Sequence, residues 1–142
     1  MDLLEKYDNK KYPHQSESFK VIGACMEVHK VLGKGLLEIV YKDALEIEFN
    51  RQNIEFEREK KYEVNYKGNL LKHNFYADFV VFDKIILEVK AQSGIVEDHF
   101  KQTLNYLAIL KMKLALLINF GNDFLQFNRV VLKKNLCLSV AK

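Results

Sequence analysis

Three charged side chains, Asp78, Glu88 and Lys90, interrupt the apolar stretch FYADFVVFDKIILEVKA, which spans residues 75–91. Two carboxylates held close together on a buried sheet repel each other, and burying them is costly unless a cation lies between them. Oxygen ligands alone suit a hard ion such as Mg²⁺ or Mn²⁺. A lysine beside such an ion can hold an attacking water or stabilise charge on a phosphate. This hairpin is therefore a candidate metal site.

The turn between the two strands decides whether these groups meet. If Val81 pairs with Ile85 across a three-residue loop, Asp78 lies opposite Glu88. Because side chains alternate along a strand, one face of the sheet would then carry Asp78, Val80, Ile86, Glu88 and Lys90. A two-residue loop would instead put the two carboxylates on opposite faces. The alternative interpretation of the same residues is a salt-bridge cluster of lysine, aspartate and glutamate at the end of a sheet.

Helical periodicity predicts three helices around this hairpin. Ser16 or Ser18 is expected to cap the first, whose apolar residues recur at helical spacing until two glycines end it. A second helix is expected over about residues 36–52. The third is expected over residues 96–110, after the hairpin.

The remaining segments have the pattern of strands. Alternating residues from 62 to 66 lead into a turn and then into the hairpin, which makes three meandering strands. The strand at 85–90, the helix at 96–110 and a continuously apolar strand at 114–119 form a βαβ unit, and one more strand follows. Such a crossover should be right-handed and should join parallel strands. The predicted fold is α/β, with a mixed sheet of antiparallel meander plus parallel strand, flanked by helices.

Length and composition are those of one ordinary globular domain. The chain has 142 residues, 49% of them hydrophobic, and a formal net charge of +3. Residues 1–15 are polar and are expected to form a flexible N-terminal arm before a single domain at 16–142. The two cysteines lie far apart, and no run approaches the ~20 apolar residues of a membrane span. A reduced, cytoplasmic protein with no membrane partner is expected.

Three further polar residues lie at the margins of helical apolar stripes. Glu38 flanks the stripe of the helix at 36–52. Gln102 and Tyr106 are i, i+4 neighbours that flank the stripe of the helix at 96–110. Taken singly, each is more typical of a helix edge than of a functional site.

Together, the order of these residues resembles that of the PD-(D/E)xK nuclease superfamily. The matching residues are Glu38, Asp78, Glu88, Val89, Lys90, Gln102 and Tyr106. The segment GLLEIVY, residues 35–41, is also similar to the signature of the bacterial GxxExxY proteins, a group within that superfamily. The resemblance covers about residues 18–132. It departs from the pattern at Ala77, where the family usually has proline before the aspartate.

The resemblance implies a restriction-endonuclease-like core and a metal-dependent site. Asp78 and Glu88 would bind Mg²⁺ or Mn²⁺, with the Val89 carbonyl as a further ligand. Lys90 would orient or activate the water and offset charge on the phosphate. Glu38 would hold a metal-bound water or a second ion. Positioning of the site or of the nucleic-acid backbone would fall to Gln102 and Tyr106.

Three functional hypotheses follow. The first is a Mg²⁺-dependent nuclease that hydrolyses phosphodiester bonds of nucleic acid, with DNA as the favoured substrate. The second is a non-catalytic nucleic-acid or protein-binding module on the same fold, since a core this small leaves little surface for choosing a substrate. A homodimer or a protein partner would then supply that surface. The third is a purely structural salt-bridge cluster.

Overall fold

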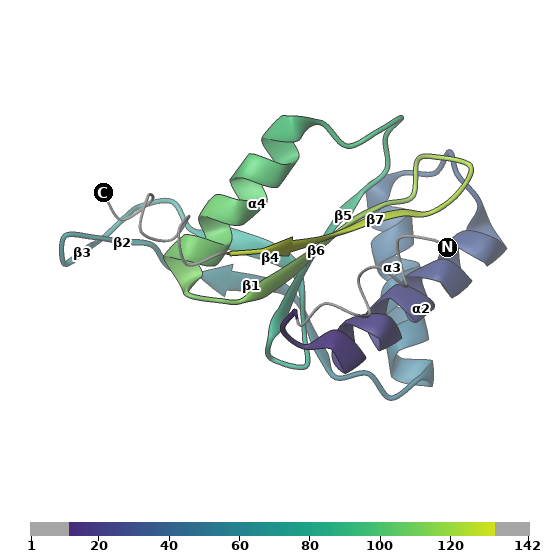
Figure 1. The fold of residues 1–142 in the computed structure, drawn as a ribbon, viewed down its shortest axis with the longest axis horizontal. Helices are drawn as coiled ribbons and strands as arrows, with labels where there is room; N and C mark the ends of the chain where they lie inside the picture. The colour runs from purple at the N-terminus through teal and green to yellow at the C-terminus, as the bar shows by residue number, and fades with distance from the viewer. Residues whose placement is uncertain (1–11, 133–142) are drawn as a thin grey trace.

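The computed structural model describes residues 12–132, which form a mixed β-sheet with helices on both faces (Figure 1). The helices are α2 (Gln15–Leu32), α3 (Glu38–Arg51) and α4 (Glu97–Leu110). The main sheet contains β1 (Phe56–Tyr62), β4 (Phe75–Val81), β5 (Ile85–Lys90), β6 (Leu114–Asn119) and β7 (Gln126–Val131). A separate small hairpin consists of β2 (Asn65–Tyr66) and β3 (Asn69–Leu70).

The sheet has the order β1-β4-β5-β6-β7. Strand β4 pairs antiparallel with both β1 and β5. Strand β5 pairs parallel with β6, and β7 pairs antiparallel with β6. The parallel pair is joined through α4, because a parallel neighbour needs a long crossover connection. The α/β prediction, with an antiparallel meander and a parallel βαβ strand, is confirmed.

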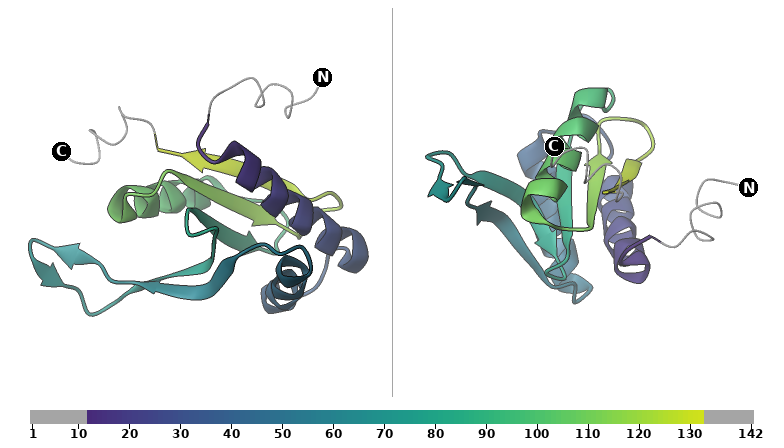
Figure 2. Two further views of the ribbon diagram at one scale, coloured as in Figure 1. Left: turned by 90° about the horizontal axis from the view of Figure 1, so that it is seen from below. Right: turned by 60° about the vertical axis from the view of Figure 1, so that its left-hand side comes forward.

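Helices cover both faces of the sheet (Figure 2), and an apolar core lies on each face. On one face, α2 and α3 pack against alternate residues of β5, among them Ile85, Leu87 and Val89. On the other face, Ile86 packs in the core beneath α4 with Leu107. Every residue of β6 is buried, as expected for a central strand that is covered on both faces.

The start of α2 differs from the prediction. The helix begins at Gln15, and His14 occupies the N-cap position in a left-handed conformation without a side-chain capping bond. Ser18 is buried, and its hydroxyl donates to the carbonyl of Gln15 at 2.9 Å, so neither predicted serine caps the helix. Of the arm predicted at residues 1–15, residues 1–11 lie outside the described part of the chain.

A buried amide at the end of β6 holds the end of β5 in place. The Asn119 side chain accepts from the Gln92 N–H at 3.0 Å and donates to the Gln92 carbonyl at 2.9 Å. It also accepts from the N–H of Gly121. A Cβ at Gly121 would overlap the Gln92 backbone, so only glycine allows this close approach. The end of β5 is thereby tied to β6.

The β2–β3 hairpin extends away from the main sheet (Figures 1 and 2). Its turn residues Lys67 and Gly68 both have positive φ, as a tight two-residue hairpin turn requires. The Asn65 side chain accepts from the Gly68 N–H at 2.8 Å and closes the turn. Within residues 12–132, none of the helices has the length and apolar character to cross a membrane.

Candidate active site

The β4–β5 hairpin brings Asp78 and Glu88 together. Val81 pairs with Ile85, so the loop has three residues, which is the alternative that brings the two carboxylates together. The regular pairs end at Phe79–Leu87, one step before Asp78 and Glu88. Beyond that point, side chains replace the backbone ladder. The Val89 N–H donates to Asp78 Oδ2 at 2.8 Å, and the Asp78 N–H donates to Glu88 Oε2 at 3.2 Å. The backbone hydrogen bonds between β4 and β5 are interrupted here, and we call this interruption, with Asp78 and Glu88 at its two sides, the carboxylate gap.

The alternation of β4 shifts at Asp78. Phe75 and Ala77 pack in the core beneath α4, whereas Phe79 and Val81 pack against α2 and α3. In an ideal strand these four residues would share one face. The register between β1 and β4 is the same on both sides of this point, so the shift is a local distortion of the strand pair and not an inserted residue.

The predicted single face is therefore only partly correct. Val80 and Ile86 do lie together in the core beneath α4. Asp78 instead bonds to a residue of α3, because the shift in β4 separates it from the alternation of Val80. The sequence prediction assumed strict alternation along β4, so it could not include this shift.

A buried lysine that the sequence analysis missed completes the cluster. The Lys42 side chain is only 9% exposed, and its ammonium donates to Asp78 Oδ1 at 3.0 Å and to Glu59. Burial opposes the charged ammonium, but its bonds to Glu59 and Asp78 outweigh this effect and raise the pKa of Lys42. Glu59 has a positive φ within β1, opposite the shift in β4. Asp78 thus has a cationic partner within the protein.

A signal for Lys42 was present in the sequence. It precedes Leu45 by three residues and Phe49 by seven, so a helical wheel places it on the buried side of α3. A charged residue is almost never fully buried unless it is paired. The sequence could therefore have indicated an acidic partner for Lys42, although not which one.

The charge of Glu88 is disfavoured by its surroundings. Burial and the neighbouring charge of Asp78 raise the pKa of Glu88 from 4.5 to about 8. The Asp78 N–H and the positive charges of Lys90 and Lys42 oppose that shift without cancelling it. The positive charge around Glu88 is therefore too weak to offset its burial and the charge of Asp78.

Lys90 and Glu38 lie at different distances from this cluster. Lys90 is half-buried at the end of β5, two residues beyond Glu88, and its carbonyl accepts from the Phe120 N–H at 2.8 Å. Its charge acts on Glu88, so the two side chains are near one another. Glu38 is exposed in the first turn of α3, one helical turn before Lys42. No hydrogen bond or ion pair of the described residues joins Glu38 to Asp78 or Glu88.

Gln102 and Tyr106 lie on α4 without a described bond to the carboxylate gap. Gln102 is exposed. Tyr106 is half-buried, and its ring stacks on Phe75 with the centroids 3.7 Å apart. The contact of Tyr106 is therefore with the start of β4, three residues before Asp78.

Comparison with known proteins identifies the family. The family model described as the PD-(D/E)XK nuclease superfamily matches residues 15–130. The chain belongs to this superfamily. The crystal structure of SSO0001 is similar in fold, with a TM-score of 0.50 and 21% sequence identity. That match covers 72% of this chain and 54% of SSO0001, so the chain spans about half the length of that protein. No curated protein sequence matches the chain at a significant level.

The carboxylate gap of this PD-(D/E)XK chain fits a hard divalent cation. Mg²⁺ keeps several waters and commonly binds proteins through one or two carboxylates. Asp78 and Glu88 supply two, and the unfavourable charge of Glu88 is the feature that a bound cation would relieve. Within residues 12–132, no group of three or more acidic, histidine or cysteine side chains is arranged for a metal. A cation here would therefore keep most of its ligands as water.

The protonation of Glu88 predicts how stability depends on pH without metal. Between about pH 4.5 and about pH 8 the folded chain binds a proton at Glu88 that the unfolded chain has lost. The free energy of unfolding should therefore fall as the pH rises through this window, by at least about 1 kcal/mol. Glu88→Gln should weaken that dependence. Urea unfolding in the presence of a chelator measures it.

The matched control is Glu97→Gln, since Glu97 is exposed and pairs only with Lys101 on the surface of α4. That control should keep the pH dependence of the wild type. If Glu88→Gln and wild type show the same pH dependence, Glu88 does not have the raised pKa.

The bond between Lys42 and Asp78 predicts a strong energetic coupling. A double-mutant cycle with Lys42→Met and Asp78→Asn should give a coupling energy of about 1–3 kcal/mol in urea unfolding. Lys42→Met leaves the partly buried Asp78 carboxylate without its cation, and Asp78→Asn removes one of the two carboxylates that pair with the buried Lys42 ammonium. The exposed pair Lys34–Asp123 is the control and should couple by less than about 1 kcal/mol. Equal coupling in the two cycles would show that Lys42 is not a significant partner of Asp78.

Proposed function

We propose that the chain is a Mg²⁺-dependent nuclease that hydrolyses phosphodiester bonds of nucleic acid, with DNA as the favoured substrate. The observation that carries the proposal is the carboxylate gap, where Asp78 and Glu88 meet at the end of the β4–β5 ladder. Lys90 follows two residues after Glu88 on β5. In a chain of the PD-(D/E)XK superfamily, this set supports metal-assisted hydrolysis.

Each residue of the gap would have a separate task. Asp78 and Glu88 would hold the cation, and the carbonyl of Val89 would be a further ligand. When bound, the cation makes a water more acidic and offsets charge on the phosphate. The Lys90 ammonium would orient the attacking water beside Glu88. Glu38, exposed at the start of α3, would contact a metal-bound water or a second ion.

The two α4 residues would act on the surroundings of the gap. Tyr106 would position the start of β4 through its stacking on Phe75. Gln102 is exposed one turn earlier on the same helix and would contact the nucleic-acid backbone. Lys42 would hold the Asp78 carboxylate in a fixed orientation.

The segment GLLEIVY supports membership in the GxxExxY group as part of this proposal. Gly35 has a φ of 101°, which a residue with a side chain rarely adopts. Tyr41 is fully buried, and its hydroxyl donates to the Gly33 carbonyl at 2.6 Å. The glycine and the tyrosine thus shape the loop before α3, and the intervening Glu38 is left exposed at the helix start.

The second candidate function is a non-catalytic binding module. Lys42 favours it, because this ammonium already neutralises Asp78 and would have to share the carboxylate with a metal. In this second candidate function, a homodimer or a protein partner would complete a larger binding surface.

Cleavage assays separate the two candidates. Wild type with Mg²⁺ should cleave at least one of single-stranded DNA, duplex DNA and RNA, and a chelator should stop the reaction. Asp78→Asn, Glu88→Gln and Lys90→Ala should each reduce the rate at least about a hundredfold, since each removes charge at the reacting centre. Asp43→Asn is the control, because Asp43 is exposed on α3 and pairs with Arg58.

Cleavage that survives Asp78→Asn would contradict the nuclease assignment at this site. A pure wild-type protein that cleaves none of the three substrates would favour the binding module.

A further inference from the structure

The β2–β3 hairpin is a projection whose side chains are open to solvent. Residues 65–73 are all exposed, and the hairpin stands out from the sheet in both views of Figure 2. Yet the segment is ordered by its own bonds, including the Asn65–Gly68 closure and a Leu71 N–H bond to the Val64 carbonyl at 2.9 Å. A formed but unpacked hairpin of this kind presents a surface to something outside the chain.

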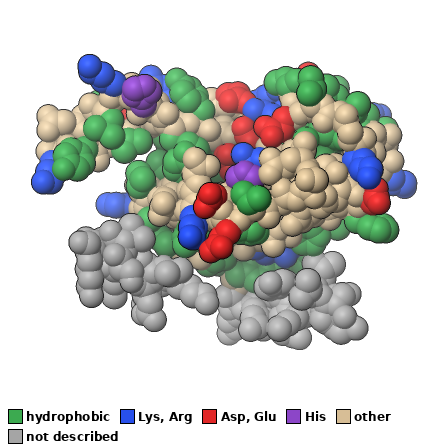
Figure 3. Space-filling view, turned by 90° about the horizontal axis from the view of Figure 1, so that it is seen from above, with side chains coloured by type: hydrophobic (Ala, Val, Ile, Leu, Met, Phe, Trp, Pro, Cys, Tyr) green, Lys and Arg blue, Asp and Glu red, His purple; other side chains and the backbone are tan. Residues whose placement is uncertain are grey.

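The hairpin and its base are positively charged. Residues 60–73 contain four lysines and His73 but one acidic residue, Glu63. None of the ion pairs described for residues 12–132 involves Lys61, Lys67 or Lys72. In Figure 3 the hairpin, at upper left, carries basic, histidine and apolar side chains. This charge is complementary to a polyanion.

Exposed aromatic rings accompany these lysines. Tyr66 is 58% exposed on the hairpin, and Tyr76 is 52% exposed at the start of β4. The Lys67 ammonium lies 5.4 Å from the centroid of the Tyr66 ring. Exposed rings among lysines are the arrangement with which proteins bind unpaired bases, because every base has a face that can stack.

A continuous strand surface leads from the hairpin to the carboxylate gap. Lys61 and Tyr76 are directly paired across β1 and β4, and both are exposed. Their neighbours Tyr62 and Phe75 pack in the core beneath α4, so Lys61 and Tyr76 face away from α4. Asp78 follows Tyr76 by two residues, about 7 Å along the strand.

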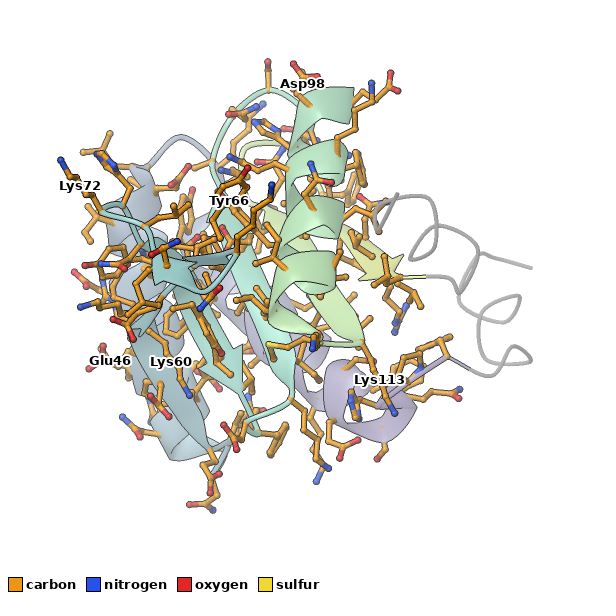
Figure 4. The ribbon with its side chains drawn as sticks, turned by 90° about the vertical axis from the view of Figure 1, so that its left-hand side faces the viewer. Glu46, Lys60, Tyr66, Lys72, Asp98 and Lys113 are labelled. Carbon is orange, nitrogen blue, oxygen red and sulfur yellow. The ribbon has the colours of Figure 1, made fainter. Side chains whose placement is uncertain are left out.

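Another basic segment lies near the base of the hairpin. The Tyr62 hydroxyl contacts the Met112 sulfur at 3.7 Å, which places the end of α4 beside β1. Lys113 is exposed there, and Figure 4 places it at lower right, apart from Lys72 at upper left and Lys60 at lower left. Lys113 is thus a separate basic side chain near the base of the hairpin.

We propose that the β2–β3 hairpin and the strand surface of Lys61 and Tyr76 bind a single-stranded stretch of nucleic acid and lead it to the carboxylate gap. Tyr66 and Tyr76 stack on bases, and Lys61, Lys67 and Lys72 contact phosphates. The inference rests on the proposed function, since it specifies the form of nucleic acid that reaches that site.

Binding without cleavage tests the inference. The fluorescence anisotropy of a labelled single-stranded DNA oligonucleotide is measured with the full chain in the presence of a chelator. Tyr66→Ala and Tyr76→Ala should each weaken binding about tenfold through the loss of stacking. Phe124→Ala is the control, because Phe124 is 86% exposed in the loop between β6 and β7 and should not affect binding.

Charge is tested through the salt dependence of the same binding. The double variant Lys67→Gln/Lys72→Gln should lower the slope of log affinity against log salt by about 1.4, or about 0.7 per phosphate contact on a single strand. The double variant Lys20→Gln/Lys30→Gln, with both changes at exposed positions of α2, should keep the wild-type slope.

Three results would overturn the inference: unchanged affinity in both tyrosine variants, tighter binding of duplex than of single-stranded DNA, or no binding of single-stranded DNA by wild type. If the hairpin variants lose binding while wild type cleaves nothing, the hairpin inference stands and the proposed function fails. If the hairpin variants bind normally while Asp78→Asn abolishes cleavage, the proposed function stands and the hairpin inference fails.

Discussion

Two carboxylates in one partly buried gap between β4 and β5 are the constraint on which the rest of the site depends. Like charges this close need compensating positive charge or a proton. Backbone N–H groups of Asp78 and Val89 donate to the two carboxylates, and Lys42 pairs with Asp78. Glu88 is left with a raised pKa, so the compensation is incomplete. A divalent cation would supply what is missing.

The surrounding elements fix the positions of the two carboxylates at the end of the β4–β5 ladder. The three-residue loop sets the strands in register, and the shift at Asp78 ends their ladder where the carboxylates begin. The Asn119 amide ties the chain after β5 to β6. From the other side, α3 brings Lys42 to Asp78, and the Tyr41 hydroxyl shapes the loop that starts that helix. Packing and polar bonds thus converge on one position of the sheet.

Local pattern was sufficient to predict the fold class, and it predicted the approach of Asp78 to Glu88 on condition that the loop at 82–84 has three residues. Alternating apolar residues and the loop at 82–84 determine the register of the hairpin, and these are properties of neighbouring residues. The contact between Lys42 and Asp78 joins residues 36 apart, so no local pattern could specify it. The positive φ of Glu59 and the shift in β4 are departures from regular strand geometry, and an argument from regular alternation leaves them out. The residue before α2 is His14 and not a serine, because the preference for serine at the N-cap is statistical and other residues can occupy that position.

A crystal of the full chain soaked in Mn²⁺ is the most direct test of whether the carboxylate gap is a metal site. An anomalous scattering peak within coordination distance of both Asp78 and Glu88 is the predicted result, and the same soak of Asp78→Asn should show no peak there. An ordered Lys42 that still bonds Asp78 in the soaked wild type, with no Mn²⁺ at the gap, would contradict the metal site. The cluster would then be a structural ion pair.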